Sequence, residues 1–294
     1  MASSPLNPKT HYHARSISLP SRRHPLINQL DEHLCRLRSS EATSSLSSIG
    51  EKLSGLRDLY DCVDELLLLP LPQLVLAQER HEKWVDEVFD GSLRLLDVCG
   101  TTKDVLLQTK ENAQELQSIL RRRRGDDSGL ANGVGEYLTS RKKAKKVIRK
   151  SLRDLKSKCI FSPLDKDHDT LAVVGMLREV EEATLTVLES FLSFIYGLKA
   201  QSKPSSWSLI SKLLHSKRVV CEEYATEINE FEVVDAALHT LVSDKTKSSN
   251  VHAEKVQKEL EKLESSIQDL EEGLEPLLRR LIKTRVSLLN ILNH

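Results

Sequence analysis

Three carboxylates alternate with other residues in the stretch DKDHD, at Asp165, Asp167 and Asp169. This is the spacing of the first, third and fifth ligands of an EF-hand calcium loop. Position six is Thr170, however, where the loop needs Gly for its turn, and position twelve is Met176, where it needs a bidentate Glu. The stretch therefore predicts the acidic start of a helix rather than a calcium site.

Other residues that could do chemistry also lack a productive pattern. The histidines show no metal-ligand spacing, and His81-Glu82 is not followed by the second His of a zincin helix. The chain contains no G-x-S-x-G, no phosphate-binding Gly loop and no dinucleotide fingerprint. We expect no enzyme activity, no metal and no cofactor.

The five cysteines form no C-x-x-C pair, so neither a disulfide framework nor a zinc site is indicated. We therefore expect the protein to reside in a reducing compartment. We expect its cysteines to be buried as small hydrophobic residues. They are Cys35, Cys62, Cys99, Cys159 and Cys221.

The N-terminal stretch HARSISLPSRRHP carries a candidate modification site. Its core, RSISLP, fits R-S-x-S-x-P, which resembles the phosphoserine motif bound by 14-3-3 proteins. Phosphorylation of Ser18 or Ser16 would add nearly two negative charges that an Arg cluster on a partner can grip. The alternative is a flexible basic tail in which Ser and Pro only prevent folding. The motif residues are Arg15, Ser16, Ser18 and Pro20.

A second candidate is a concentration of positive charge. Residues 121–158 carry a net charge of +10, whereas the rest of the neutral chain carries −10. The cations that form the predicted basic patch are Arg121, Arg122, Arg123, Arg124, Arg141, Lys142, Lys143, Lys145, Lys146, Arg149, Lys150 and Arg153. A narrow apolar stripe accompanies them, at Ala144, Ile148, Leu152, Leu155 and Cys159, so the helix can dock while its cations face outward.

Several partners fit this patch: anionic lipid, nucleic acid, or an acidic surface of this or another protein. Neutralisation by acidic helices of the same chain fits equally well. No aromatic residues are interleaved with the cations, which disfavours binding of single-stranded nucleic acid. SRKKAKK resembles a nuclear-import signal, but a packed helix would expose it poorly.

The segments that position these residues are all predicted to be helices. Aromatic residues make up only 4% of the chain, so Leu, Val and Ile must form the core, as in helix-on-helix packing. We expect an all-α, elongated multi-helix bundle over residues 26–294, with a disordered tail at 1–25. Its basic helix is expected at 136–160, after a Gly-rich loop that follows Arg124.

The C-terminal segment 251–292 has the most regular pattern. Its apolar residues alternate steps of four and three, which predicts a coiled-coil-like seam that closes within the bundle. Gly273 and Pro276 predict a kink there, or two consecutive helices. The seam residues are Val256, Leu260, Leu263, Ile267, Leu270, Leu274, Leu277 and Leu281.

The longest apolar run, LLLLPLPQLVLA at 66–77, is too short to span a bilayer. We expect an intracellular, most simply cytoplasmic, protein. A peripheral membrane, nuclear or plastid location is also compatible, because residues 1–30 contain no acidic residue, as in transit peptides.

Six ordered blocks resemble a plant-specific family of helical proteins related to the BYPASS proteins. They are HARSISLPSRRHP, RSSEATSSLSSI, LRDLYDCVDELLLLPLPQ, SLRLLDVCGTTKDVLLQTKE, EYLTSRKKAKKVIRK and LIKTRVSLLNIL. The resemblance covers residues 11–293 and implies a non-enzymatic role in root and shoot development. We therefore expect an interaction or scaffold protein, with a peripheral protein that binds anionic lipid through 141–158 as the alternative. The oligomeric state is left open.

Overall fold

The computed structural model describes residues 24–39, 45–122, 127–157, 168–197, 229–243 and 249–293. Within these ranges the chain is all-α, as predicted, and contains no strand. The helices are α1 (Pro25–Ser39), α2 (Leu46–Leu67), α3 (Pro70–Gln78), α4 (Lys83–Arg122), α5 (Asp127–Ser157), α6 (His168–Tyr196), α8 (Glu230–Ser243) and α9 (Ser249–Asn293).

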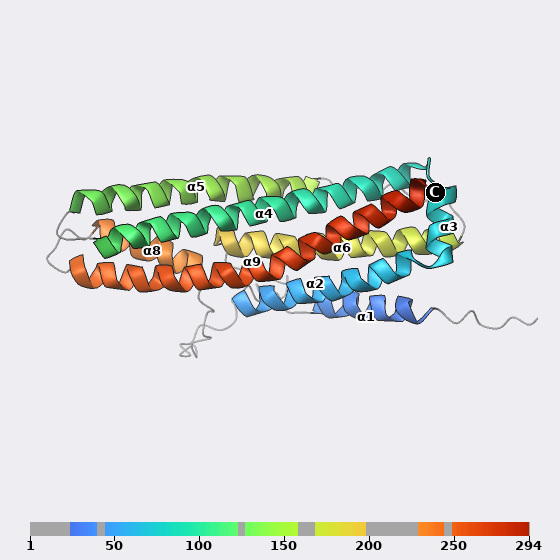
Figure 1. The fold of residues 1–294 in the computed structure, drawn as a ribbon, viewed down its shortest axis with the longest axis horizontal. Coiled ribbons are helices and arrows are strands. Elements are labelled where there is room, and N and C mark those ends of the chain that lie inside the picture. The colour runs from blue at the N-terminus through green and yellow to red at the C-terminus, as the bar shows by residue number, and fades with distance from the viewer. Residues whose placement is uncertain are drawn as a thin grey trace, which may run out of the picture.

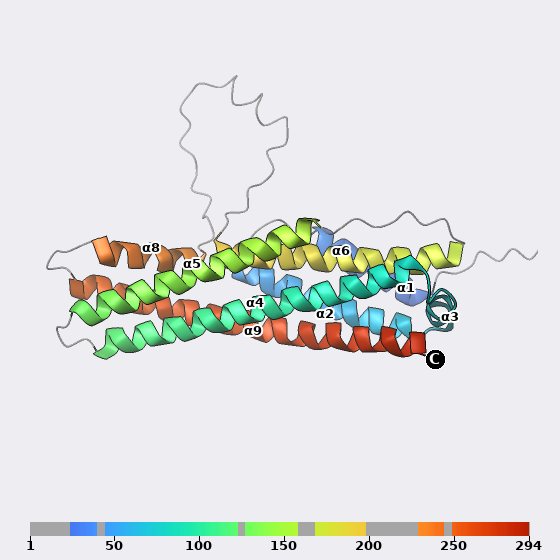
Figure 2. The same cartoon turned by 90° about the horizontal axis from the view of Figure 1, so that it is seen from above.

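The long helices run side by side along one axis and form an elongated bundle (Figure 1). Seen from above, α4, α5, α6 and α9 keep this direction, while the short α3 lies across one end (Figure 2). Helix α9 packs against α2, α4 and α8, and α1 packs against α2 and α6. The architecture is therefore a rod of helices closed at one end by α3.

Helix α2 shows how local signals produce these elements. Ser45 is its N-cap, and the Ser45 side chain accepts a hydrogen bond of 3.1 Å from the backbone N–H of Ser48. Its apolar positions recur every three or four residues and are buried. At Gly55 a Cβ would lie 2.9 Å from Leu37 Cδ2, so the missing side chain lets α1 approach closely.

The predicted seam on α9 is entirely buried. All eight seam residues are at most 4% exposed, and they face α2, α4 and α8. The seam therefore closes within the chain. Helix α9 is continuous through Gly273 and Pro276, so the prediction of two consecutive helices is wrong; Figure 1 shows that it changes direction along its length.

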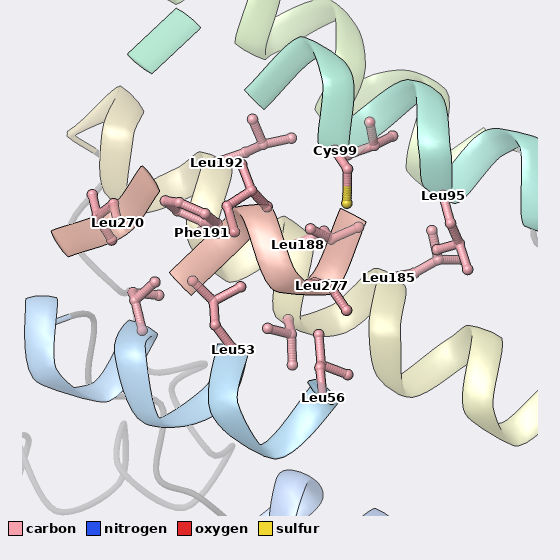
Figure 3. Packing of buried hydrophobic residues seen from close by; sticks show 14 of the residues in the cluster. Leu53, Leu56, Leu95, Cys99, Leu185, Leu188, Phe191, Leu192, Leu270 and Leu277 are labelled. Atoms are coloured by element: carbon pink, nitrogen blue, oxygen red, sulfur yellow. The ribbon is translucent and has the colours of Figure 1, made fainter. Parts of the chain in front are cut away.

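Leucine dominates the core, as the low aromatic content requires. Figure 3 shows Leu53 and Leu56 of α2, Leu188 of α6 and Leu277 of α9 meeting in its middle. The thiol of Cys99 points into the same cluster. Cys62 is also buried, as predicted, but Cys35 is exposed on α1.

The loop predicted after Arg124 is instead helical from Asp127 onward. Leu130, Val134 and Tyr137 are buried at helical spacing, and this burial outweighs the low helix propensity of the nearby glycines. Gly133 faces Ile119 so closely that a Cβ would crowd it, so the glycine serves α4–α5 packing. The basic helix therefore begins at Asp127 rather than at residue 136, and residues 158–160 of the predicted helix lie outside the described residues.

Candidate functional site: a cationic face on one helix

The apolar residues of α5 decide which of its cations turn inward. Ala144, Ile148 and Leu155 are buried and Leu152 is half-buried, so the predicted stripe is confirmed at these positions. Cys159 lies outside the described residues. With one stripe buried against α4 and α6, the cations are divided between the edge of the stripe and the opposite face.

Arg141 is the buried cation of this helix, at 4% exposed. Its Nε lies 3.4 Å from Oδ2 of Asp235 on α8, and its Nη2 donates to the backbone carbonyl of Ile195. The guanidinium also lies 4.9 Å from the centre of the Phe231 ring. These contacts replace part of the water around the charge, while Nη1 of Arg141 and Oδ1 of Asp235 are buried without a hydrogen-bond partner among the described residues.

Two further cations follow along the same edge. Lys145 Nζ lies 2.8 Å from Asp235 Oδ2 and 5.8 Å from the centre of the Tyr196 ring. Arg149 donates to the Tyr196 hydroxyl, and its guanidinium carbon lies 5.6 Å from that ring. This cluster ties the end of α6 and the start of α8 to α5, so part of the basic patch is neutralised within the chain.

The remaining cations point away from the bundle. They form what we call the cationic face: Lys142, Lys143, Lys146, Lys150 and Arg153. All five are exposed, and none makes an ion pair with a residue that the structure describes. They recur at intervals of one, three and four residues, which places them on one side of the helix.

The N-terminal arginines of the predicted patch are not part of the cationic face. Arg121 bonds Gln117 and lies 3.2 Å from Glu261 of α9, while Arg122 bonds Ser118. Arg123 and Arg124 lie outside the described residues. The N-terminal half of α5 separates Arg121 and Arg122 from the cationic face.

An open groove of about 830 Å³ lies beside the cationic face, between α4 and α5. Val147 and Lys150 line one wall, and the acidic residues Asp90 and Asp97 line the other. Its inner side holds ion pairs between α4 and α6: Arg94 with Glu181, and Glu87 with Arg178 at 3.0 Å.

Glu181 is a buried carboxylate in this layer. Burial raises the pKa of its carboxyl group, and the hydrogen bond from Arg94 opposes that rise. The paired charges join two helices, and among the described residues no histidine or cysteine lines the groove.

Other candidates lie outside the described part of the chain. This applies to Arg15, Ser16, Ser18 and Pro20 of the RSISLP motif, and to Asp165 and Asp167 of the DKDHD stretch. Within the described ranges, no group of three or more His, Cys, Asp or Glu residues could hold a metal ion. In the same ranges, no helix combines the length and apolar character needed to cross a membrane.

The sequence interpretation missed the role of Asp235. The sequence leaves open whether the cations of this helix face solvent or an acidic helix of the same chain, and it does not single out Arg141, whose partner lies 94 residues away. One signal was available: Arg141 lies four residues after Tyr137 and three before Ala144, on the apolar stripe.

The family of the chain is settled by a family model described as Protein BPS1, which matches residues 52–291. The chain belongs to this BPS1 family. The match confirms the resemblance to BYPASS-related plant proteins. It runs from α2 to α9 and includes the cationic face, while the RSISLP motif precedes it. No curated protein and no solved structure gives a significant match.

Proposed function

We propose that this chain is a non-enzymatic interaction protein acting in root and shoot development, which binds acidic partner proteins through its cationic face. The observation that carries the proposal is the division of charge on α5. Arg141 and Lys145 are paired inside the bundle, while five cations on the opposite side lack a described ion-pair partner. Membership of the BPS1 family supports the developmental setting.

The cationic face is suited to electrostatic recognition. Its five charges lie within 142–153, about 16 Å of helix at about 1.5 Å per residue, so they repel one another. A partner with closely spaced carboxylates would relieve this repulsion and be attracted from a distance. The rigid bundle beneath holds the charges in register, because α5 is anchored by its buried stripe.

An anionic membrane is the second candidate partner for the same face. Val147 is exposed among the cations, and an apolar side chain at such a position can enter the lipid headgroup layer while the cations meet phosphate. On this alternative the chain is a peripheral membrane protein.

We further propose that phosphorylation of Ser18, with Ser16 as a second acceptor, regulates partner capture through a 14-3-3-type protein. The support is the R-S-x-S-x-P pattern and the absence of acidic residues before Asp31.

The decisive experiment reverses the charge of Lys142, Lys146 and Lys150 to Glu in the full chain. Lys145 is kept, because it pairs with Asp235. The matched control reverses the exposed lysines Lys255, Lys258 and Lys262 on α9, which gives the same net charge; of these, Lys262 is paired with Glu259 on the same helix face. Binding is measured by anisotropy with a fluorescent polyglutamate peptide and by flotation with phosphatidylserine vesicles.

We expect the cationic-face variant to bind the peptide at least about tenfold more weakly, while the control binds like wild type. If the cationic-face variant loses binding to vesicles but still binds the peptide, an anionic membrane replaces an acidic protein as the proposed partner. Equal loss in both variants would show a response to net charge alone and would refute both. In plants that lack this gene, the cationic-face variant should fail to restore root and shoot growth.

A further inference from the structure

Helix α4 carries a row of acidic side chains that face away from the bundle. They recur every seven residues, so they drift by only about 20° per step around a straight helix and share one side of it. All are exposed, and none makes an ion pair with a residue that the structure describes. We call them the acidic stripe: Asp90, Asp97, Asp104 and Glu111.

The acidic stripe and the cationic face belong to neighbouring helices. Helices α4 and α5 run side by side in opposite directions (Figures 1 and 2). The open groove of about 830 Å³ lies between them, with Asp90 and Asp97 on one wall and Lys150 on the other. This side of the rod therefore presents a negative row and a positive row that run parallel to each other.

The register of the two helices can be read from their contacts. The side chain of Asn112 on α4 donates a hydrogen bond of 2.7 Å to the hydroxyl of Ser140 on α5. Gly133 of α5 faces Ile119 of α4, which is the same register seven residues away. The hairpin therefore keeps one register over these turns.

Continued toward the groove, this register brings opposite charges to the same height along the rod. Asp104 is level with residue 148, between Lys146 and Lys150. Asp97 is level with residue 155, close to Arg153. Within one chain these groups form no described ion pair, because each row points outward from its own helix.

We propose that a second copy of this chain docks on this side of the rod, so that the acidic stripe of each copy meets the cationic face of the other. A two-fold axis along the groove gives this arrangement, because it keeps the height of each residue and exchanges the two helices. Asp104 of one copy then faces Lys146 and Lys150 of the other copy, and the same contact is repeated by symmetry. A two-fold axis across the rod would oppose like charges instead.

The groove itself supplies an apolar centre for this contact. Val147 is 44% exposed and lines the groove, so it lies beside the proposed axis and meets its own copy. An apolar centre inside a charged rim is the usual anatomy of a protein interface. A different protein would have to provide both rows of charge at this spacing, whereas a second copy provides them automatically. The inference rests on the proposed function, since it uses the cationic face, and it names the acidic partner.

The test compares the self-association of three variants of the full chain with that of wild type, by sedimentation velocity at low and high salt. The basic-side variant is Lys146→Glu with Lys150→Glu, and the acidic-side variant is Asp97→Lys with Asp104→Lys. The control is Lys255→Glu with Lys258→Glu on α9, which matches the net charge of the basic-side variant. All substituted side chains are exposed, so the variants should fold, which circular dichroism checks.

We expect wild type to form a dimer that weakens as salt rises. The basic-side and acidic-side variants should each dimerise at least about tenfold more weakly, because their two rows then repel those of a second copy. An equal mixture of the two variants should form a one-to-one complex, since a mainly negative side then meets a mainly positive one. The control should dimerise like wild type. Carbodiimide cross-linking of isotope-labelled with unlabelled wild type should join Asp104 of one copy to Lys146 or Lys150 of the other.

Wild type that stays monomeric, a dimer insensitive to salt, or a mixture that forms no complex would overturn the inference. Polyglutamate binding separates this failure from failure of the proposed function. The acidic-side variant keeps every cation of the cationic face, so it should bind the peptide at least as well as wild type. Peptide binding by a wild type that never dimerises would refute the second copy as partner and leave the cationic face as a site for other acidic proteins.

Discussion

The carboxylate of Glu181 on α6 occupies the space that a side chain at position 91 of α4 would take. A Cβ built on Gly91 would overlap both oxygens of that carboxylate. Arg94, one turn further along α4, donates a hydrogen bond to Oε1 of Glu181. The glycine and the arginine thus create a small buried recess for one acidic side chain.

Because of this recess, alanine substitution should have opposite effects on stability at two glycines of α4. Gly91→Ala should lower the free energy of unfolding by about 1–3 kcal/mol, because Glu181 must leave its recess or α4 must shift. A Cβ added at Gly100 would meet no neighbouring helix within 4 Å among the described residues, so Gly100→Ala should be neutral or stabilising by up to about 1 kcal/mol. Urea titration of both variants measures the difference. Equal destabilisation of both would show that the recess is unimportant.

Removing the charge of Asp235 should loosen α8. Asp235→Asn leaves Arg141 as a buried cation without its carboxylate, which should cost about 2–4 kcal/mol. Hydrogen exchange should rise first over 230–243. The control is Glu179→Gln, which breaks the exposed pair with Arg38 and should cost less than about 1 kcal/mol. If Asp235→Asn costs no more than the control, the cluster around Arg141 contributes little to stability.

The thiols should differ in reactivity. Cys35 is exposed, whereas burial raises the pKa of Cys62 and raises that of Cys99 to about 12. Since the thiolate is the reactive form, iodoacetamide should label Cys35 in the native protein and reach the other two only after unfolding. Peptide mapping by mass spectrometry reads out each site. Native labelling of Cys99 at the rate of Cys35 would contradict the packing in Figure 3.

Stability should fall at alkaline pH. Between pH 9.0 and about 12 the unfolded chain releases the thiol proton of Cys99 while the folded chain keeps it. Because the folded state then binds more protons, its free energy of unfolding decreases as pH rises. Burial raises the pKa of Tyr60 and Tyr137 as well, which adds to the loss at higher pH. Urea titrations across this range should show a shallower decline for Cys99→Ala than for Cys35→Ala.

The regulatory proposal predicts a phosphate-dependent complex. Full-length chain phosphorylated on Ser18 should bind a 14-3-3 protein with micromolar or tighter affinity, about −8 kcal/mol, and Ser18→Ala treated with the same kinase should not. Calorimetry measures both. Binding that is independent of phosphate, or absent in both forms, would remove the motif from the proposed mechanism.

Much of the fold follows from the sequence because helical periodicity is a local signal. The seam on α9 was predicted from spacing and residue type alone. The start of α5 was not, because the glycines of 125–135 suggested a loop. The role of Gly133 depends on its contact with Ile119, which no local pattern reveals.

The candidate site was predicted only in outline. The concentration of cations on α5 is visible in the sequence, but its division is set by tertiary contacts. Arg141 and Lys145 turn inward because α8 places Asp235 beside them. The apolar run at 66–77 is visible in the sequence as a segment too short to span a bilayer, but the exposure of Leu68, Leu71 and Leu74 depends on how α3 crosses the end of the bundle.

Helix α9 has a consequence for how the protein is made. Its seam residues complete the core against α2, α4 and α8, yet they are synthesised after those helices. A nascent chain that has emerged only as far as α8 therefore exposes the apolar stripes of α2 and α4 to solvent or to chaperones. Folding of the rod must wait until the 45-residue helix α9 has been synthesised, so products that stall before α9 should be directed to degradation.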